Sequence, residues 1–182
     1  KLDPTNPFDV SKAEVIARKQ IHELISFLKE NSNAFHESAL ISVAVNIGVR
    51  ESRKLKGVHI LTGDELINCT RFEDSIALGN YDIDIHSPTG TGTSHRYFGD
   101  GEYYTIPYRS LLPKEYDNLL VAGRCISATH EAQASVRIMP ICCCLGEAAG
   151  TAVAIAHNTN KNVHTVDTKA LQKKLMENGA ML

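Results

Sequence analysis

The stretch that decides the fold covers residues 118–140 and reads Asn118-Leu-Leu-Val-Ala-Gly123-Arg-Cys-Ile-Ser-Ala-Thr-His130-Glu-Ala-Gln-Ala-Ser-Val-Arg137-Ile-Met-Pro140. Its continuous apolar run over 119–122 predicts a short strand covered on both faces. Gly123 ends that strand, where the backbone must turn or approach a ligand closely. Pro140 then predicts the start of a long helix over about 139–157. A strand, a loop and a helix in this order are typical of an α/β domain.

The loop between Gly123 and Pro140 predicts an anion site. Arg124 and Arg137 bracket this loop. The first backbone N–H groups of the helix at Pro140 have no partner except a capping group or a ligand, and a helix N-terminus attracts negative charge. A buried helix preceded by an ordinary loop has the same sequence pattern, so both interpretations stay open at this point.

The long helix also resembles a membrane span, because residues 138–156 are nearly all apolar or small. Gly146 and Gly150 have the spacing that lets helices pack closely in lipid. Glu147 in the middle, Pro140 near the start and many Ala, Cys and Thr side chains favour instead a helix buried inside a protein. We therefore expect no membrane contact.

The rest of the chain changes its hydrophobic period several times. Helices are predicted from the capping boxes Ser11-x-x-Glu14 and Thr62-x-x-Glu65 and from Asp167, with Gly179 at the end of the last one. The first of these helices should end near Asn31. Alternating or β-rich runs predict strands over 41–47, 75–78, 81–86 and 103–108, and the glycine-rich residues 87–101 predict an exposed loop.

These signals together predict an α+β or mixed α/β fold in four parts. An N-terminal helix occupies 1–35, and a curved, mostly antiparallel sheet with loops occupies 36–116. One strand–loop–helix unit covers 117–157, and a final helix covers 158–182. A single strand–helix unit is not a domain, because its helix has to bury every face against something. The sequence therefore predicts a fragment of a larger two-domain protein.

Composition excludes some classes of function. Nineteen Lys and Arg against 21 Asp and Glu leave no basic field, and Trp is absent, so we expect no nucleic-acid partner. The five cysteines include the consecutive Cys142, Cys143 and Cys144, which fan out around a helix and cannot all ligate one ion. We interpret the cysteines as small buried residues and expect no metal site.

Several motifs, in this order, resemble the C-terminal part of FAD-dependent oxidoreductases of the glutathione-reductase-like superfamily. The nearest resemblance is to a subgroup that includes bacterial proteins related to xanthan lyases. It spans roughly residues 40–157 and rests on Gly48-Val-Arg50-Glu-Ser-Arg53, Ser75-Ile-Ala-Leu-Gly79, Asp82-Ile-Asp-Ile-His86, Ile106-Pro-Tyr-Arg109 and Ala122-Gly-Arg124.

The resemblance implies FAD as cofactor and hydride transfer between the flavin and a small-molecule substrate. It implies that the Gly123 segment lies along the ribityl chain, and that the helix starting near Pro140 points its N-terminus at the pyrimidine edge of the flavin. Arg124 stands where many relatives have an acidic residue, which favours a contact to the pyrophosphate or to a structural carboxylate. The implied cofactor-binding residues are Arg50, Gly123, Arg124, Ser135, Ile138, Met139 and Pro140.

The same resemblance implies candidate catalytic residues. His130 and Arg137 lie in a region similar to the one that holds a catalytic arginine in fumarate-reductase-like relatives, and His86 ends a predicted strand. A neutral histidine suits proton transfer near pH 7. The competing interpretation of each histidine is a structural role. The competing interpretation of Arg50 is that it belongs to a solvated basic face.

None of the 12 glycines forms the G-x-G-x-x-G turn with which such enzymes bind the ADP half of FAD. We therefore expect the chain to be a C-terminal portion whose partner is the nucleotide-binding half of the same protein, and to bind FAD weakly or not at all alone. One alternative is a non-catalytic module that binds a partner or a saccharide. Another is a polysaccharide lyase that uses His86, Tyr108 and Arg109.

Overall fold

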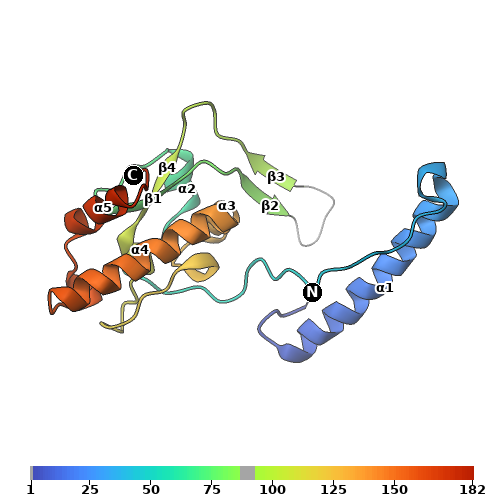
Figure 1. The fold of residues 1–182 in the computed structure, drawn as a ribbon, viewed down its shortest axis with the longest axis horizontal. Coiled ribbons are helices and arrows are strands. Elements are labelled where there is room, and N and C mark those ends of the chain that lie inside the picture. The colour runs from blue at the N-terminus through green and yellow to red at the C-terminus, as the bar shows by residue number, and fades with distance from the viewer. Residues whose placement is uncertain (1, 87–92) are drawn as a thin grey trace. The chain divides into compact units, whose positions relative to one another are not determined.

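Figure 1 shows the computed structural model, which describes residues 2–86 and 93–182. The chain divides into two compact units, Lys1–Ser52 and Arg53–Leu182. The predicted mixture of helices and antiparallel strands is confirmed. Within the described residues the strands form two separate two-stranded sheets and not the single curved sheet that we predicted.

The N-terminal unit is dominated by one long helix, α1, Pro7–Asn31. Its end is as predicted, but it begins before the predicted capping box, because the Asn6 side chain accepts a hydrogen bond from the Phe8 N–H and Pro7 opens the first turn. The Ser11 hydroxyl donates instead to the Pro7 carbonyl within the helix. The short 3₁₀-helix η1, Asn33–Phe35, follows.

The predicted strand over 41–47 is wrong. These residues form no strand and include a bend at 45–46, and Ile41 is 96% exposed. Side chains of α1 hold the segment in place: Arg18 donates to the Val45 carbonyl at 3.0 Å, and the Glu14 carboxylate accepts from the Ile47 N–H. Alternation alone cannot make a strand, because a strand needs a neighbouring backbone to pair with.

The C-terminal unit contains the four strands that the described residues form. β1, Ser75–Gly79, pairs antiparallel with β4, Tyr104–Pro107, and β2, Ile83–His86, pairs antiparallel with β3, Thr93–Arg96. The strands predicted around β1, β2 and β4 are thus confirmed. β3 falls inside the predicted loop 87–101, of which residues 87–92 lie outside the described part of the chain.

The helices of this unit complete its core. They are α2, Gly63–Ile67; α3, His130–Val136; α4, Met139–Asn158; and α5, Thr168–Glu177, with the 3₁₀-helices η2, Tyr108–Leu111; η3, Gly123–Cys125; and η4, Val163–Thr165. The predicted capping box at Thr62 and the Asp167 cap are both confirmed. α4 and α5 pack against each other and against β1 (Figure 1).

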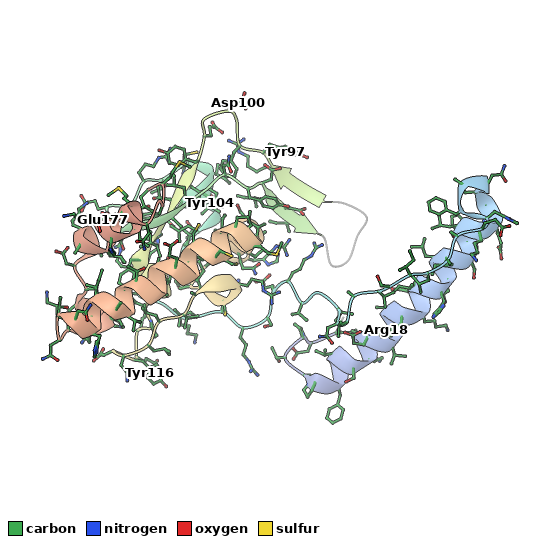
Figure 2. All side chains as sticks on the ribbon, viewed as in Figure 1. Arg18, Tyr97, Asp100, Tyr104, Tyr116 and Glu177 are labelled. Atoms are coloured by element: carbon green, nitrogen blue, oxygen red, sulfur yellow. The ribbon has the colours of Figure 1, made fainter. Side chains whose placement is uncertain are left out.

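β1 and β4 also show why a glycine stands at Gly79. A Cβ there would lie 2.5 Å from the ring of Tyr104, which is fully buried. Figure 2 shows Tyr104 inside the C-terminal unit. The close approach of the two strands therefore requires the absence of a side chain at this position.

α4 is buried on one face within this unit, and its other face, which we predicted to be buried in a larger protein, is exposed here. The buried residues are Ile141, Leu145, Ala148, Ala152 and Ala156. A Cβ at Gly146 or Gly150 would meet nothing within 4 Å, and Val153 is 50% exposed. By length and composition α4 is able to cross a membrane, but core helices of soluble proteins meet the same criteria.

Candidate functional site

The predicted strand over 119–122 is also wrong, and the turn at Gly123 is held in another way. Residues 119–122 form no strand, and Leu119 is 45% exposed. Main-chain hydrogen bonds fix the segment on both sides of the turn: Val121 N–H donates to the Leu111 carbonyl, and Leu55 N–H donates to the Cys125 carbonyl, both at 2.9 Å. The turn is thus anchored to two distant parts of the chain.

Gly123 itself has the backbone conformation that favours glycine. Its φ is +82°, and a Cβ at this position would meet nothing within 4 Å. Because both neighbours of the turn are pinned by main-chain bonds, this open face is a fixed feature of the structure. A ligand can therefore approach the backbone here without a side chain in the way.

α3 replaces most of the loop that we predicted before the long helix. The Thr129 side chain caps it by accepting from the Ala132 N–H, and the Thr129 N–H donates to the Leu61 carbonyl at 2.8 Å. The short helix is anchored because the residues before it are buried between two other segments: Ser127 N–H donates to the Ser110 carbonyl, and Leu61 N–H donates to the Ser127 carbonyl.

Ser135, a predicted cofactor contact, lies on α3 and is fully buried. Its hydroxyl is 2.6 Å from the Tyr104 hydroxyl and donates to the Tyr81 carbonyl. Burial raises the pKa of Tyr104, and the hydrogen bond to Ser135 opposes that shift. Ser135 therefore ties α3 to β4 and to the segment before β2, and its cofactor role stays a prediction.

The N-terminus of α4 is exposed. Ile138 is the N-cap residue in an extended conformation and makes no side-chain cap hydrogen bond to the described residues, while Met139 is 81% exposed and Pro140 is also exposed. The N–H groups of this first turn are therefore available to a ligand. Arg137 lies between α3 and α4, and its Nε donates to the Ala134 carbonyl at 3.2 Å.

The structure brings the Gly123 turn and α4 together, because η3 packs against α4. Arg124 is exposed, and its charge lies close enough to Cys142 in α4 to lower the pKa of that thiol, although burial dominates and raises it. Thus Gly123, Arg124 and the start of α4, all predicted site residues, form one cluster.

The remaining candidates are not part of this cluster, or the structure does not give their position relative to it. His130 is exposed at the start of α3, next to Glu131, whose pKa is lowered by a hydrogen bond from its own backbone and by the Thr129 hydroxyl. Arg50 belongs to the N-terminal unit, so the structure does not place it relative to α4. His86 ends β2, and its side chain lies outside the described part of the chain.

The cysteines are not the buried residues that we predicted. Cys125, Cys143 and Cys144 are exposed, and Cys69 and Cys142 are half-buried. All five are free thiols. Sequence reasoning missed that η3, which ends at Cys125, packs against α4, because no pattern in the sequence connects these two elements.

A second feature that sequence reasoning missed is an ion pair between Asp74, which precedes β1, and Arg109, which lies in η2 after β4. Arg109 Nε and Nη2 donate to Asp74 Oδ2 and Oδ1 at 2.9 and 3.2 Å, and the Arg109 backbone N–H also donates to Oδ2. The neighbouring Tyr108 hydroxyl donates to the Val163 carbonyl at 2.8 Å. Tyr108 and Arg109, two of the three residues named for a lyase, thus make contacts inside the protein. Within residues 2–86 and 93–182 no group of three His, Cys, Asp or Glu is arranged to hold a metal ion.

A family model described as FAD dependent oxidoreductase matches residues 1–175. The chain belongs to the FAD-dependent oxidoreductase family. The match covers both compact units, so the N-terminal unit is part of this flavoprotein sequence and not an unrelated extension. No curated protein and no solved structure matches the chain.

Membership of the FAD-dependent oxidoreductase family implies FAD, and the cluster around Gly123 fits this cofactor. The open backbone face at Gly123 leaves room for an extended chain such as the ribityl group. The exposed, uncapped first turn of α4 offers N–H donors and a positive dipole end within the described structure. No buried carboxylate stands against these groups in the described part of the chain: the only buried acidic residue there, Asp74, is paired with Arg109.

Proposed function

We propose that this chain forms the part of a flavoprotein oxidoreductase that closes over the ring end of FAD, in an enzyme that transfers hydride between a small-molecule substrate and the flavin. The observation that carries this proposal is the open Gly123 turn packed beside the exposed N-terminus of α4. FAD would supply the hydride-accepting ring. The motif order supports placing the chain in the glutathione-reductase-like superfamily, near the bacterial subgroup related to xanthan lyases.

The residues of the cluster would hold FAD in distinct ways. Gly123 would let the ribityl chain lie against the backbone, because a side chain there would occupy the same space. The first turn of α4 would face the pyrimidine edge with the N–H groups of Ile138 and Met139, where the helix dipole favours negative charge; Pro140 has no N–H and would contribute only the fixed start of the helix. Arg124 adds a cation at the rim of this site, suited to the pyrophosphate.

Of the three catalytic candidates, Arg137 directly precedes α4 and is the nearest along the chain to the proposed ring site. We assign it a contact to the substrate. His130 lies at the other end of α3, about 10 Å away at the helical rise per residue. A proton-transfer role for His130 therefore requires a substrate that extends away from Arg137.

The proposed partner of this chain is the nucleotide-binding half of the same flavoprotein. The chain has no G-x-G-x-x-G turn, so the ADP group of FAD needs a site elsewhere. The outer face of α4 is apolar and built of small residues, among them Gly146, Gly150 and Ala154, and is exposed in the described structure. A protein surface covering that face explains why it is apolar without placing α4 in lipid.

The first experiment expresses the longest natural reading frame that contains this chain and measures FAD binding by visible absorption and fluorescence quenching. Bound flavin is expected. In that protein Gly123→Val should weaken FAD binding by about tenfold or more, because the new side chain fills the space that the ribityl group needs. Gly101→Val is the matched control, since Gly101 has φ +79° and an equally open Cβ position in the turn before β4.

Two results would count against the proposal. One is a full-length protein that is colourless and takes up no added FAD. The other is equal loss of FAD affinity in the Gly123 and Gly101 variants, which would mean that backbone strain, about 1–2 kcal/mol for a non-glycine residue in this conformation, is the whole effect.

A second experiment tests the partner surface with Gly150→Leu. In the 182-residue chain this change should leave stability unchanged or raise it, because the Cβ position is open and leucine favours helix more than glycine does. In the longest natural protein it should destabilise the fold and release flavin, since the side chain would clash with the covering half. Equal behaviour in both proteins would remove α4 from that interface.

A further inference from the structure

A pocket of about 330 Å³ lies beside the β1–β4 sheet, between the segment that leads into β1 and the helix α5. Its volume is at the lower end of the range for small-molecule sites, about 300–1,000 Å³. Its walls come from residues 71–75, from Tyr103 and Thr105 at the start of β4, from α5 and from Leu182. The cluster around Gly123 comes instead from η3 and α4, so the pocket is built from other parts of the chain than the proposed flavin site.

Hydrogen bonds hold the walls of this pocket in place. On one side the Thr105 hydroxyl oxygen accepts from the Phe72 N–H at 2.8 Å, which fixes the segment before β1 against β4. On the other side Gln172 Nε2 donates to the Glu73 and Ser75 carbonyls at 2.8 and 2.9 Å, which holds α5 on the edge of β1. The pocket is therefore formed before any ligand enters, as small-molecule sites usually are.

Arg71 presents a cation at this pocket in a fixed orientation. Its Cζ lies 3.1 Å from the centroid of the Tyr103 ring, and the guanidinium makes no ion pair or hydrogen bond to the described residues. An arginine stacked on a ring keeps its N–H donors free in the plane of the guanidinium, where they match the two oxygens of a carboxylate.

A second cation lies in the same walls. Lys169 Nζ is 3.4 Å from the Glu73 carbonyl oxygen, and both side chains line the pocket. With Arg71 they make two cations and one carboxylate, so the charged side chains of the walls are net positive. The pocket therefore favours an anion over a cation.

The rest of the walls suits an apolar body. Phe72, Met176 and Leu182 line the pocket, and Met176 is 52% exposed. A ligand with a hydrocarbon part would remove this apolar surface from water, which favours binding. A bare inorganic anion would use the charges and leave the apolar walls unused.

Ser75 adds a polar group without a partner to the same walls. The residue is 5% exposed, and its hydroxyl makes no hydrogen bond to the described residues. A buried hydroxyl that lacks a partner destabilises the folded protein. An acceptor atom that enters the pocket, or a water molecule held beside it, would satisfy this donor.

We propose that this pocket binds a short carboxylic acid with an apolar chain. Arg71 and Lys169 hold the carboxylate, and Phe72 and Met176 cover the chain. The carboxylate has the planar shape that the stacked guanidinium recognises, and the chain uses the apolar walls. The site does not depend on flavin binding, so it stands or falls separately from the proposed oxidoreductase function.

The test titrates hexanoate into the 182-residue chain and into the longest natural protein by isothermal titration calorimetry. Hexanoate should bind at one site in both proteins. In nuclear magnetic resonance spectra of the 182-residue chain, the amide signals of Phe72, Thr105 and Gln172 should move most. Acetate lacks the apolar chain and 1-hexanol lacks the charge, so each should bind about tenfold more weakly than hexanoate or worse.

Arg71→Gln should weaken hexanoate binding by about tenfold or more, because the neutral side chain cannot form charge-assisted hydrogen bonds. The same variant should leave the weak binding of 1-hexanol unchanged. Arg96→Gln is the matched control, since Arg96 is also exposed and lies over an aromatic ring, with Cζ 5.9 Å from the Phe98 centroid, but does not line the pocket. This variant should bind hexanoate as the unaltered chain does.

Four results would overturn the proposal. Two are a failure of the unaltered chain to bind hexanoate and binding of 1-hexanol as tight as that of hexanoate. The third is equal affinity for hexanoate in the Arg71 and Arg96 variants. The fourth is binding to the 182-residue chain but not to the longest natural protein, which would mean that the rest of the protein covers the pocket. Circular dichroism of both variants checks that these exposed substitutions leave the fold intact.

Discussion

The two units of this chain are stabilised in different ways. α1 in the N-terminal unit is 25 residues long and has no buried residue. In the C-terminal unit the strands have four or five residues and α3 has seven, yet side chains such as Leu61 and Tyr104 are fully buried. Figure 2 shows this contrast between Arg18 on the open helix and Tyr104 inside the other unit. A long capped helix can form from local signals, whereas short elements need a shared core.

This comparison predicts cooperative unfolding for the C-terminal unit and gradual loss of helix for α1. The largest effect is expected for Leu145→Ala, which deletes a fully buried side chain from α4 and should lower the free energy of unfolding by about 2–5 kcal/mol. Leu24→Ala in α1, where the side chain is 57% exposed, should change that free energy by less than about 0.5 kcal/mol. Urea denaturation followed by tyrosine fluorescence reports the C-terminal unit, because all six tyrosines lie there. Similar costs for both variants would mean that the N-terminal unit shares the core.

The next test concerns the pair of Asp74 and Arg109. Asp74→Ala removes three hydrogen bonds to Arg109 and should cost about 1–2 kcal/mol, less than a fully buried pair because the Arg109 side chain is 48% exposed. Glu177→Ala, which breaks the exposed pair with Lys174, is the control and should be nearly neutral. The same urea titration measures both. If Asp74→Ala proves as mild as Glu177→Ala, the pair does not hold β1 to η2.

Removing one helix cap in each unit is expected to have a smaller effect that differs between the two units. Asp167→Ala removes the cap of α5 and should lower the melting temperature of the core, at a cost of about 1 kcal/mol. Asn6→Ala removes the cap of α1 and should reduce helical circular dichroism while leaving the melting of the core unchanged. A lower core melting temperature in Asn6→Ala would contradict the independence of the two units.

The smallest expected effect is on the free energy of unfolding at alkaline pH. Burial raises the pKa of Tyr108 to about 12, from an ordinary value of 10.0. Because the folded state holds this proton more tightly than the unfolded state, Tyr108 contributes stability below pH 10 that is lost as the pH rises from 10 to 12. Tyr108→Phe should therefore flatten the decline of unfolding free energy over that window, as measured by urea titrations at several pH values. An unchanged slope would mean that other groups govern the alkaline loss.

Local signals in the sequence were sufficient for the elements that carry their own caps. The capping box at Thr62 and the Asp167 cap gave α2 and α5, because each cap satisfies backbone donors within a few residues. The strand prediction over 41–47 failed for the opposite reason. Its alternation was real, but no neighbouring strand in the described residues pairs with it, and side chains of α1 hold it instead.

For the site, the sequence by itself determined the family, through the order of motifs around Ala122-Gly123-Arg124, and the position of the long apolar helix. Only the tertiary structure decided that η3 packs against α4 and that the Ser135 and Tyr104 hydroxyls are hydrogen-bonded. Caps and periods act over a few residues along the chain and leave a mark in the sequence. Contacts between distant segments depend on how the whole core packs, so no short pattern records them.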